Sequence, residues 1–278
     1  MQAADVTAPQ VRAGIEQLRM QAVATGRMSE PIDVRVNPRR TLAVVEIPLK
    51  GTGESEQALA SLAALREDVI PATIGRVPGA TVDVSGNTTG SKDFNDVMKS
   101  NLPLVFGFVL GAAFLLLLVT FRSLVIPIKA IVLNLLSVGA SYGVLTLVFQ
   151  HGWGASLLGF EVSETSAGVT SWLPLFLFVV LFGLSMDYHV FILSRTREAF
   201  LGGASTEQAV ADGIKSTAGV VTSAAAVMIA VFAVFATLGA IEFKQMGVGL
   251  AAAILIDATL VRAVLLPATM KLLGDWNW

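Results

Sequence analysis

Cysteine is absent from this chain of 278 residues, histidine occurs only twice, and charged residues make up only 14% of it. Without cysteine there are no disulfides, thiolate metal ligands or cysteine nucleophiles, and two histidines are too few for a histidine-rich metal site. The net charge of −2 comes without a sustained Lys/Arg patch, so the electrostatic footprint of a nucleic-acid-binding protein is missing. A Gly-rich nucleotide-binding loop with a lysine is also missing. We therefore expect no metal, no bound cofactor and no direct use of ATP.

What the chain has instead is a large excess of apolar residues. They make up 54% of the sequence and give a mean hydropathy of +0.71, which is too apolar for a soluble protein of this size. After residue 101 they form five runs, each about as long as the roughly 17 to 25 residues that a helix needs to cross a bilayer. The expected spans are 102–121, 125–149, 172–194, 216–238 and 247–272. Residues 98–278 are therefore predicted to form an all-α membrane bundle of five transmembrane helices.

Residues 1–97 carry most of the charge and are predicted to form a separate domain. Apolar residues at helical spacing indicate helices at 11–23 and 56–70. Alternation on either side of a turn at 37–40 indicates a hairpin of 32–36 with 41–49, and residues 80–85 are expected to form a further strand. This order predicts a small α+β domain with helices on one face of a sheet. The first twenty residues contain no apolar core of a secretory signal.

Basic residues mark which side of the membrane each turn lies on. They flank the first and third turns between the spans and recur near the C-terminus, at Arg122, Lys129, Arg195, Arg197, Lys215 and Lys271. The second loop carries Glu161 and Glu164 but neither Lys nor Arg. Because cytoplasmic loops are enriched in Lys and Arg, we expect the first and third turns and the C-terminus in the cytoplasm. The N-terminal domain is then extracytoplasmic.

An ionisable side chain inside the third span is the most informative feature of the chain. Asp187 lies in the run Gly183–Phe191, and an acid near the middle of a membrane helix costs roughly 2.5 to 3.5 kcal/mol on insertion scales. We therefore expect Asp187 to bind and release protons, with an interhelical hydrogen bond as the alternative. The Tyr188 side chain points about 100° away from Asp187 around the helix, so its hydroxyl is expected to hydrogen-bond to a partner on another helix. His189 is a weaker candidate relay, since a packed imidazole explains it as well.

Polar residues in the last two spans are candidate supports for such a relay. Thr222 and Ser223 are expected at the depth of Asp187, although hydroxyls in membrane helices more often bond to their own backbone. Asp257 and Arg262 are five residues apart, about 140° around an α-helix, which predicts a poor ion pair. Arg262 would then approach Asp187 or, more readily, extend to the cytoplasmic interface.

Two further features of the spans concern packing. Gly107 with Gly111, and Gly139 with Gly143, have the four-residue spacing that lets membrane helices approach closely, and we expect them at helix contacts. Pro267 predicts a kink near the cytoplasmic end of the last span.

The motif at Gly183–Arg195, together with Ile256–Arg262 and the following Leu266-Pro267-Ala268, strongly resembles the MMPL (mycobacterial membrane protein large) family of the resistance-nodulation-division superfamily. The resemblance covers essentially the whole chain. It implies that residues 98–278 are transmembrane helices eight to twelve of such a transporter, and that residues 1–97 are part of its second porter domain.

What the resemblance implies for function is export of lipids or other hydrophobic compounds across a bacterial plasma membrane, driven by proton influx. Asp187 and Tyr188 match the family's proton-relay pair, which faces a second Asp-Tyr pair from another helix. This sequence has one such motif. We therefore expect it to be the C-terminal piece of an exporter, or to work with a partner chain that supplies the other half.

Two other functions are considered. An intramembrane aspartyl protease would use Asp187 and Asp257 as a pair of carboxylates that share a proton. Their expected depths differ by a helical turn or more, which argues against a shared site. An accessory membrane subunit without transport of its own would use the same acids only for helix packing.

Overall fold

Two units of the chain, Met1–Lys99 and Ser100–Trp278, each have their own apolar core in a computed structural model that describes residues 1–161 and 168–278. Helix α4 (Asn87–Phe121) begins in the first unit and ends in the second. Of the residues used to predict membrane orientation, Glu164 lies outside the described ranges.

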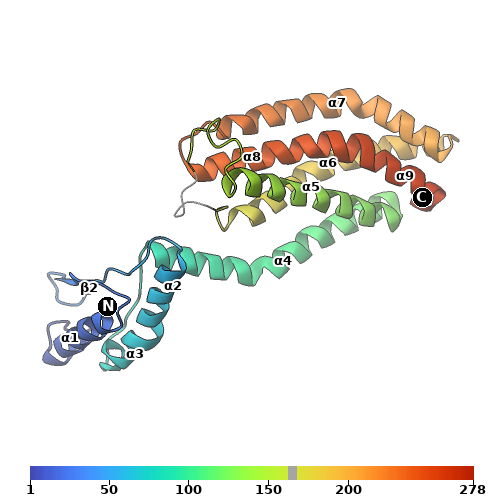
Figure 1. Cartoon of the computed structure of the whole chain (residues 1–278). Coiled ribbons are helices and arrows are strands. Elements are labelled where there is room, and N and C mark those ends of the chain that lie inside the picture. The colour runs from blue at the N-terminus through green and yellow to red at the C-terminus, as the bar shows by residue number, and fades with distance from the viewer. Residues whose placement is uncertain (162–167) are drawn as a thin grey trace. The chain divides into compact units, whose positions relative to one another are not determined.

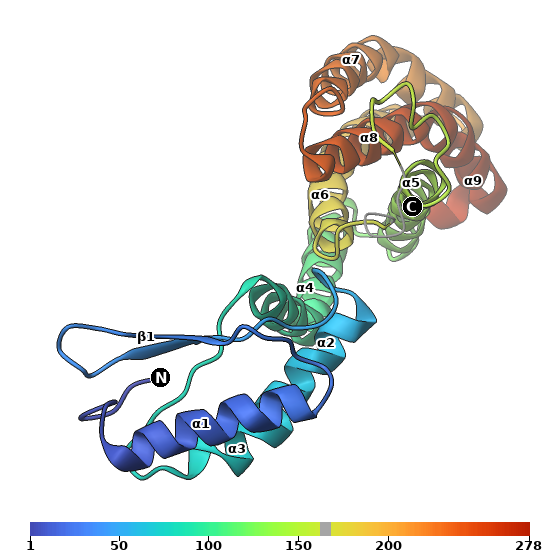
Figure 2. The ribbon, with the colours of Figure 1, turned by 60° about the vertical axis from the view of Figure 1, so that its left-hand side comes forward.

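The first unit opens with α1 (Pro9–Ala24), followed by the strands β1 (Asp33–Val36) and β2 (Ala43–Glu46). The strands pair antiparallel with Asp33 opposite Glu46, so the predicted hairpin is confirmed. Its turn is fixed by Asn37, whose side-chain oxygen accepts the backbone N–H groups of Thr41 and Leu42 at 2.8 and 3.0 Å. Apolar residues from α1 and the hairpin share one core, and Figure 2 shows the two side by side.

The predicted helix at 56–70 is present but changes its winding. It consists of α2 (Glu56–Ala63), a π-helical turn η1 (Ala64–Val69) and the short α3 (Ile70–Ala72), and a 3₁₀ turn η2 (Ile74–Arg76) follows. Ser55 caps α2 by accepting the N–H of Ala58. Arg66 in η1 binds both carboxylate oxygens of Asp93, at 2.6 and 2.7 Å, and so ties the first turns of α4 to this unit.

The strand predicted at 80–85 is wrong. Only Thr81 pairs there, through a single antiparallel bridge with Gln2. Pro78 and Gly79 precede this segment and Gly86 follows it at φ +148°, so the backbone turns away on both sides of one bridge. Within the described residues the sheet has two short strands, and the unit alone does not establish a porter-type domain.

Five helical stretches of the chain are long and apolar enough to cross a membrane, as predicted. They are α4, α5 (Val125–Phe149), α6 (Leu173–Leu201), α7 (Thr206–Phe235) and a composite fifth span that begins at Ile241. The bounds of α5 match the prediction. The other helices run past their apolar segments, α4 at its start and α6 at its end, because polar residues continue the helix beyond the apolar run. In Figure 1, α5 to α8 run alongside one another.

The fifth span is not a uniform α-helix. It consists of α8 (Ile241–Ile256), a π-helical segment η3 (Asp257–Leu265), α9 (Leu266–Leu273) and a closing 3₁₀ turn η4 (Gly274–Asn277). Pro267 lies in the first turn of α9, where its missing N–H is tolerated. The π-helical segment η3 ends at Leu265, just before Pro267, and the kink at this proline stays a prediction.

Close helix contacts occur at other glycines than those predicted. A Cβ added at Gly107, Gly111, Gly139 or Gly143 would meet nothing within 4 Å among the described residues, so these glycines make none of the expected close contacts within this part of the chain. A Cβ on Gly213 would lie 2.9 Å from the Thr196 backbone, and one on Gly247 would lie 2.7 Å from the Phe232 carbonyl oxygen. These glycines allow α7 to pack closely against α6 and α8.

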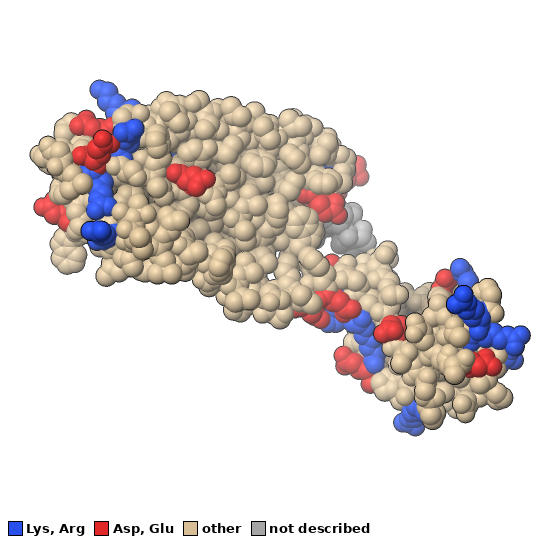
Figure 3. Space-filling model, turned by 180° about the vertical axis from the view of Figure 1, so that it is seen from behind, with Lys and Arg blue, Asp and Glu red and all other residues tan. Residues whose placement is uncertain are grey.

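The surface of the second unit reflects its apolar composition. Its middle is almost free of charged side chains on the face that Figure 3 shows, and Lys and Arg gather at one end. Near that end Arg197 donates to the Thr120 carbonyl at the end of α4 at 2.6 Å. The face in Figure 3 thus has the broad apolar surface that lipid covers.

Candidate functional site

Asp187 lies on the outward face of α6, midway between Leu173 and Leu201 and so roughly 21 Å from either end of the helix. Its side chain is exposed, and it shares an exposed stripe with Gly183, Phe191 and Ser194. Among the described residues, no hydrogen bond or ion pair involves the Asp187 carboxylate. The acid therefore points away from the bundle that its own chain forms.

Tyr188, the next residue, turns inward as its position on the helix requires. Its hydroxyl lies 3.6 Å from the sulfur of Met228 on α7, and the guanidinium carbon of Arg262 lies 4.8 Å from the centre of its ring. The second contact has the geometry of a cation–π interaction. Tyr188 thus contacts side chains from two other elements, as the sequence predicted.

Asp257 and Arg262 form a buried ion pair, which corrects the prediction that they would not meet. Nε and Nη2 of Arg262 donate to the same Asp257 oxygen at 2.9 and 2.7 Å, and the Arg262 side chain is only 3% exposed. The reason is η3: in a π-helix the hydrogen bonds run from residue i to i+5, so residues five apart lie on one face. Arg262 therefore neither extends to the interface nor contacts Asp187.

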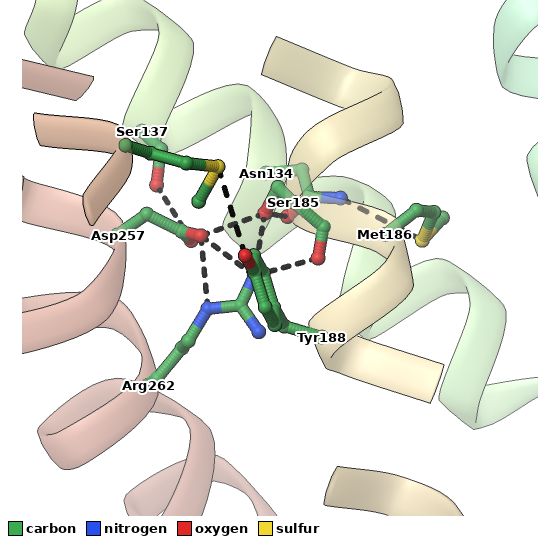
Figure 4. A network of polar contacts seen from close by, with 8 residues as sticks. Asn134, Ser137, Ser185, Met186, Tyr188, Asp257 and Arg262 are labelled. Atoms are coloured by element: carbon green, nitrogen blue, oxygen red, sulfur yellow. Dashed lines mark hydrogen bonds and ion pairs between the residues drawn. The ribbon is translucent and has the colours of Figure 1, made fainter. Parts of the chain in front are cut away.

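Three polar residues that sequence reasoning missed complete this network (Figure 4). The Ser185 hydroxyl lies 2.9 Å from the Asp257 carboxylate and 2.6 Å from the Asn134 side-chain oxygen, and Ser137 donates to the other Asp257 oxygen at 3.3 Å. Arg262 Nη2 also donates to the Ser185 carbonyl at 2.6 Å. The network links α5, α6 and η3.

A signal for the α5 residues was present in the sequence. Asn134, Ser137 and Ser141 follow one another at spacings of three and four, which places them on one face of a helix. All three are buried, and Ser141 donates to the Gly249 carbonyl of α8 at 2.8 Å. A polar stripe in an otherwise apolar span thus marks the inner face of α5.

The remaining predicted site residues are not brought to Asp187. Thr222 and Ser223 are exposed on α7 and donate to their own helix, to the carbonyls of Ala218 and Gly219 at 2.7 and 2.5 Å. His189 is fully buried, and neither of its ring nitrogens has a hydrogen-bond partner among the described residues. These contacts correspond to the packing alternatives given for the three residues.

One further buried charge lies near the C-terminal end of the bundle. The Lys129 amino group donates to the Asn277 side-chain oxygen at 2.9 Å, and Asn277 in turn donates to the carbonyls of Met270 and Gly274. This connects the start of α5 to the final turn η4. Over the described ranges, no group of three or more His, Cys, Asp or Glu side chains is arranged to hold a metal ion.

The two intramembrane acids do not form a catalytic pair. Asp257 is buried and accepts from Arg262, Ser185 and Ser137, whereas Asp187 is exposed on the other face of α6. A shared proton between carboxylates requires oxygens about 3 Å apart. The arrangement lacks that feature of an aspartyl protease.

Comparison with known proteins assigns the chain to a family. A model of the MMPL family matches residues 7–278. The mycolic acid-containing lipids exporter MmpL11 of Mycolicibacterium smegmatis is 46% identical over 209 residues, which are 75% of this chain and 21% of that protein. The heme uptake protein MmpL11 of Mycobacterium tuberculosis is 46% identical over 204 residues, 73% of this chain and 21% of that protein.

A third relative matches over nearly the whole chain. The trehalose monomycolate exporter MmpL3 of Mycobacterium tuberculosis is 33% identical over 279 residues, which are 97% of this chain and 28% of that protein. The chain thus spans between about a fifth and a little over a quarter of the length of these relatives. Two of these relatives are named as lipid exporters. Both the similarity to these exporters and the five long apolar helices support a membrane location for this chain. With a match over nearly all of its length, this chain belongs to the MMPL family.

Proposed function

We propose that this chain forms part of a proton-driven exporter of lipids or other hydrophobic compounds in a bacterial plasma membrane, with Asp187 as the residue that carries the proton. The observation on which the proposal rests is the position of Asp187 inside the apolar run of a membrane helix, roughly 10 Å before that run ends at Ser194, without a partner among the described residues of its own bundle. An ionisable group at that depth is costly to insert, which favours a functional role over a structural one. Tyr188 assists it from the next position.

The exposed stripe on α6 points to a second set of membrane helices. A carboxylate that faced only lipid would lack both hydration and a counter-charge. A Cβ added at Gly183, one turn before Asp187, would meet no atom within 4 Å among the described residues, so another helix can approach closely there. We propose that these helices, from the same polypeptide or a partner chain, supply a second Asp-Tyr pair opposite Asp187.

The proposed orientation follows the distribution of charge. The end of the bundle that carries Arg122, Arg195 and Lys215 is cytoplasmic, since cytoplasmic turns are rich in Lys and Arg. The N-terminal unit is then extracytoplasmic and the C-terminus cytoplasmic. Protons would reach Asp187 from outside and leave it toward the cytoplasm.

The cargo class is proposed from the relatives. Two of them are named as exporters of lipids and a third, as similar in sequence as the first, is named for heme uptake. Lipids and heme share a large apolar surface. Hydrophobic or lipid-like molecules are therefore the proposed cargo.

The test is Asp187→Asn in the transporter that contains this chain, reconstituted in vesicles with an imposed pH gradient and a labelled lipid as cargo. Asn is close in shape and cannot exchange protons, so export should fall to the level of empty vesicles. Insertion should not suffer, because a neutral amide is cheaper to bury than an acid. Asp212→Asn removes an exposed acid of α7 and serves as the matched control. Undiminished gradient-driven export by Asp187→Asn would contradict the proposal.

An accessory subunit without transport of its own is the second candidate. The ion pair of Asp257 with Arg262 favours it, because that pair fixes three segments together without facing outward. In that case Asp187→Asn would leave export unchanged and would instead weaken assembly with another membrane protein, which copurification measures.

A further inference from the structure

One nitrogen of the buried Arg262 guanidinium has no hydrogen-bond acceptor among the described residues. Nε and Nη2 make four contacts with Asp257 and Ser185, whereas Nη1 is buried and makes none. Leaving a buried donor without an acceptor costs about 1 to 3 kcal/mol, and more for a charged group. A partner for Nη1 is therefore expected.

Arg262 also lines a small cavity inside the bundle of the second unit. The cavity has a volume of about 20 Å³, and its polar wall is formed by Asn134, Ser137, Ser185, Tyr188, Asp257 and Arg262. A cavity needs a volume of roughly 10 to 15 Å³ to hold one water molecule, and the water needs two to four polar partners. The site meets both conditions.

The charges around the cavity select a neutral occupant. Arg262 and Asp257 neutralise each other at 2.7 Å. An anion would face the Asp257 carboxylate, and a cation would face the guanidinium, so each would meet repulsion at short range. A small molecule that both donates and accepts hydrogen bonds fits best.

We propose that one ordered water molecule occupies this cavity and connects Arg262 Nη1 to the Tyr188 hydroxyl. Tyr188 has the thioether of Met228 at 3.6 Å as its hydrogen-bond partner among the described residues, and a thioether is a weak acceptor. Water offers the hydroxyl a stronger acceptor, and it accepts in turn from Nη1.

The consequence concerns the proposed proton-carrying site, and to that extent the inference rests on the proposed function. The proposed water would link the inner network around Asp257 to Tyr188, which adjoins Asp187 in sequence. Because a guanidinium stays charged in proteins, Arg262 does not give up a proton itself. It holds the water in place, so that the Tyr188 hydroxyl has a fixed partner when Asp187 changes its protonation.

The first experiment is a structure of the transporter that contains this chain, at a resolution that shows ordered water. We expect a density peak within hydrogen-bond distance of both Arg262 Nη1 and the Tyr188 hydroxyl. A dry cavity in the wild-type protein overturns the proposal outright. This readout does not depend on transport, so it stays separate from the export test of Asp187→Asn.

The second experiment fills the cavity. Ala225→Val adds two carbon atoms to a buried residue of the cavity wall, and Ala226→Val makes the same change at the next, exposed position of α7. We expect Ala225→Val to lose the water peak and to export lipid at least several-fold more slowly, with Ala226→Val unchanged in both. Full export by Ala225→Val without the water overturns the link to Tyr188. Should Ala225→Val not fold, Tyr188→Phe is the substitute, since it removes one partner of the water and should weaken the peak.

Discussion

The buried pair of Asp257 and Arg262 allows a sharp test because the chain carries a matched exposed pair. Lys271 and Glu207 are also 2.7 Å apart, but their side chains are 66% and 70% exposed, against 3% for Arg262 and 10% for Asp257. The shortest nitrogen–oxygen distance is the same in both pairs, while their burial differs widely. We therefore expect burial to be the main cause of any difference in coupling energy between the two pairs.

The expected magnitudes are well separated. Removing one partner of a buried pair leaves an uncompensated charge and costs about 3 to 5 kcal/mol, whereas an exposed pair contributes about 0.2 to 1 kcal/mol. Asp257 also accepts from Ser185 and Ser137, and Arg262 donates to the Ser185 carbonyl, so Asp257→Asn disturbs contacts among three segments. With total stabilities of about 5 to 15 kcal/mol, such a loss is large.

The assay is a double-mutant cycle on denaturant unfolding in detergent micelles. It compares Asp257→Asn, Arg262→Gln and the double variant with Glu207→Gln, Lys271→Gln and their double variant. We expect a coupling energy of at least about 2 kcal/mol for the buried pair and below about 1 kcal/mol for the exposed pair. Equal coupling in the two pairs would refute the reasoning from burial.

Two further substitutions test helix packing and the buried amino group of Lys129. Gly213→Ala should lower the free energy of unfolding because its Cβ would lie 2.9 Å from the Thr196 backbone, whereas Gly219→Ala on the same helix meets nothing within 4 Å among the described residues and should be neutral or stabilising by up to about 1 kcal/mol. Asn277→Ala removes the acceptor of the Lys129 amino group and should cost about 1 to 3 kcal/mol, and adding Lys129→Met should restore much of the loss. Denaturant unfolding measures both, and a Gly213→Ala protein as stable as the Gly219→Ala protein would contradict the close approach.

The number of membrane spans could be predicted from the sequence because the length of an apolar run is a strong constraint. A bilayer accepts only runs of about 20 residues, and five were present. The ends were harder to predict where polar residues continue a helix into water, as at Thr206–Lys215 at the start of α7. Hydropathy predicts where a segment enters the lipid, whereas the end of a helix is set by where its backbone hydrogen bonds stop.

Two predictions were wrong for a different reason: the strand at 80–85, and the absence of a good ion pair between Asp257 and Arg262. Both predictions assumed regular geometry over a short segment. Apolar and polar residues do alternate at 80–85, but a strand also needs a neighbouring strand to pair with. Only Gln2 pairs with this segment, through one bridge to Thr81. At Asp257 the 140° separation was correct for an α-helix, and the chain adopts a π-helix instead. A pattern of side chains gives no direct sign of a change in winding.

The comparison of the two intramembrane acids shows what the structure adds to the sequence. In sequence terms Asp187 and Asp257 are equivalent, since each is an isolated acid in an apolar span and each carries the same cost of insertion. In the structure Asp257 obtains its counter-charge from its own helix, five residues away, while Asp187 obtains none within the described chain. This asymmetry is the physical ground for proposing Asp187, rather than Asp257, as the residue that exchanges protons, with Asp257 as part of the packing of the bundle.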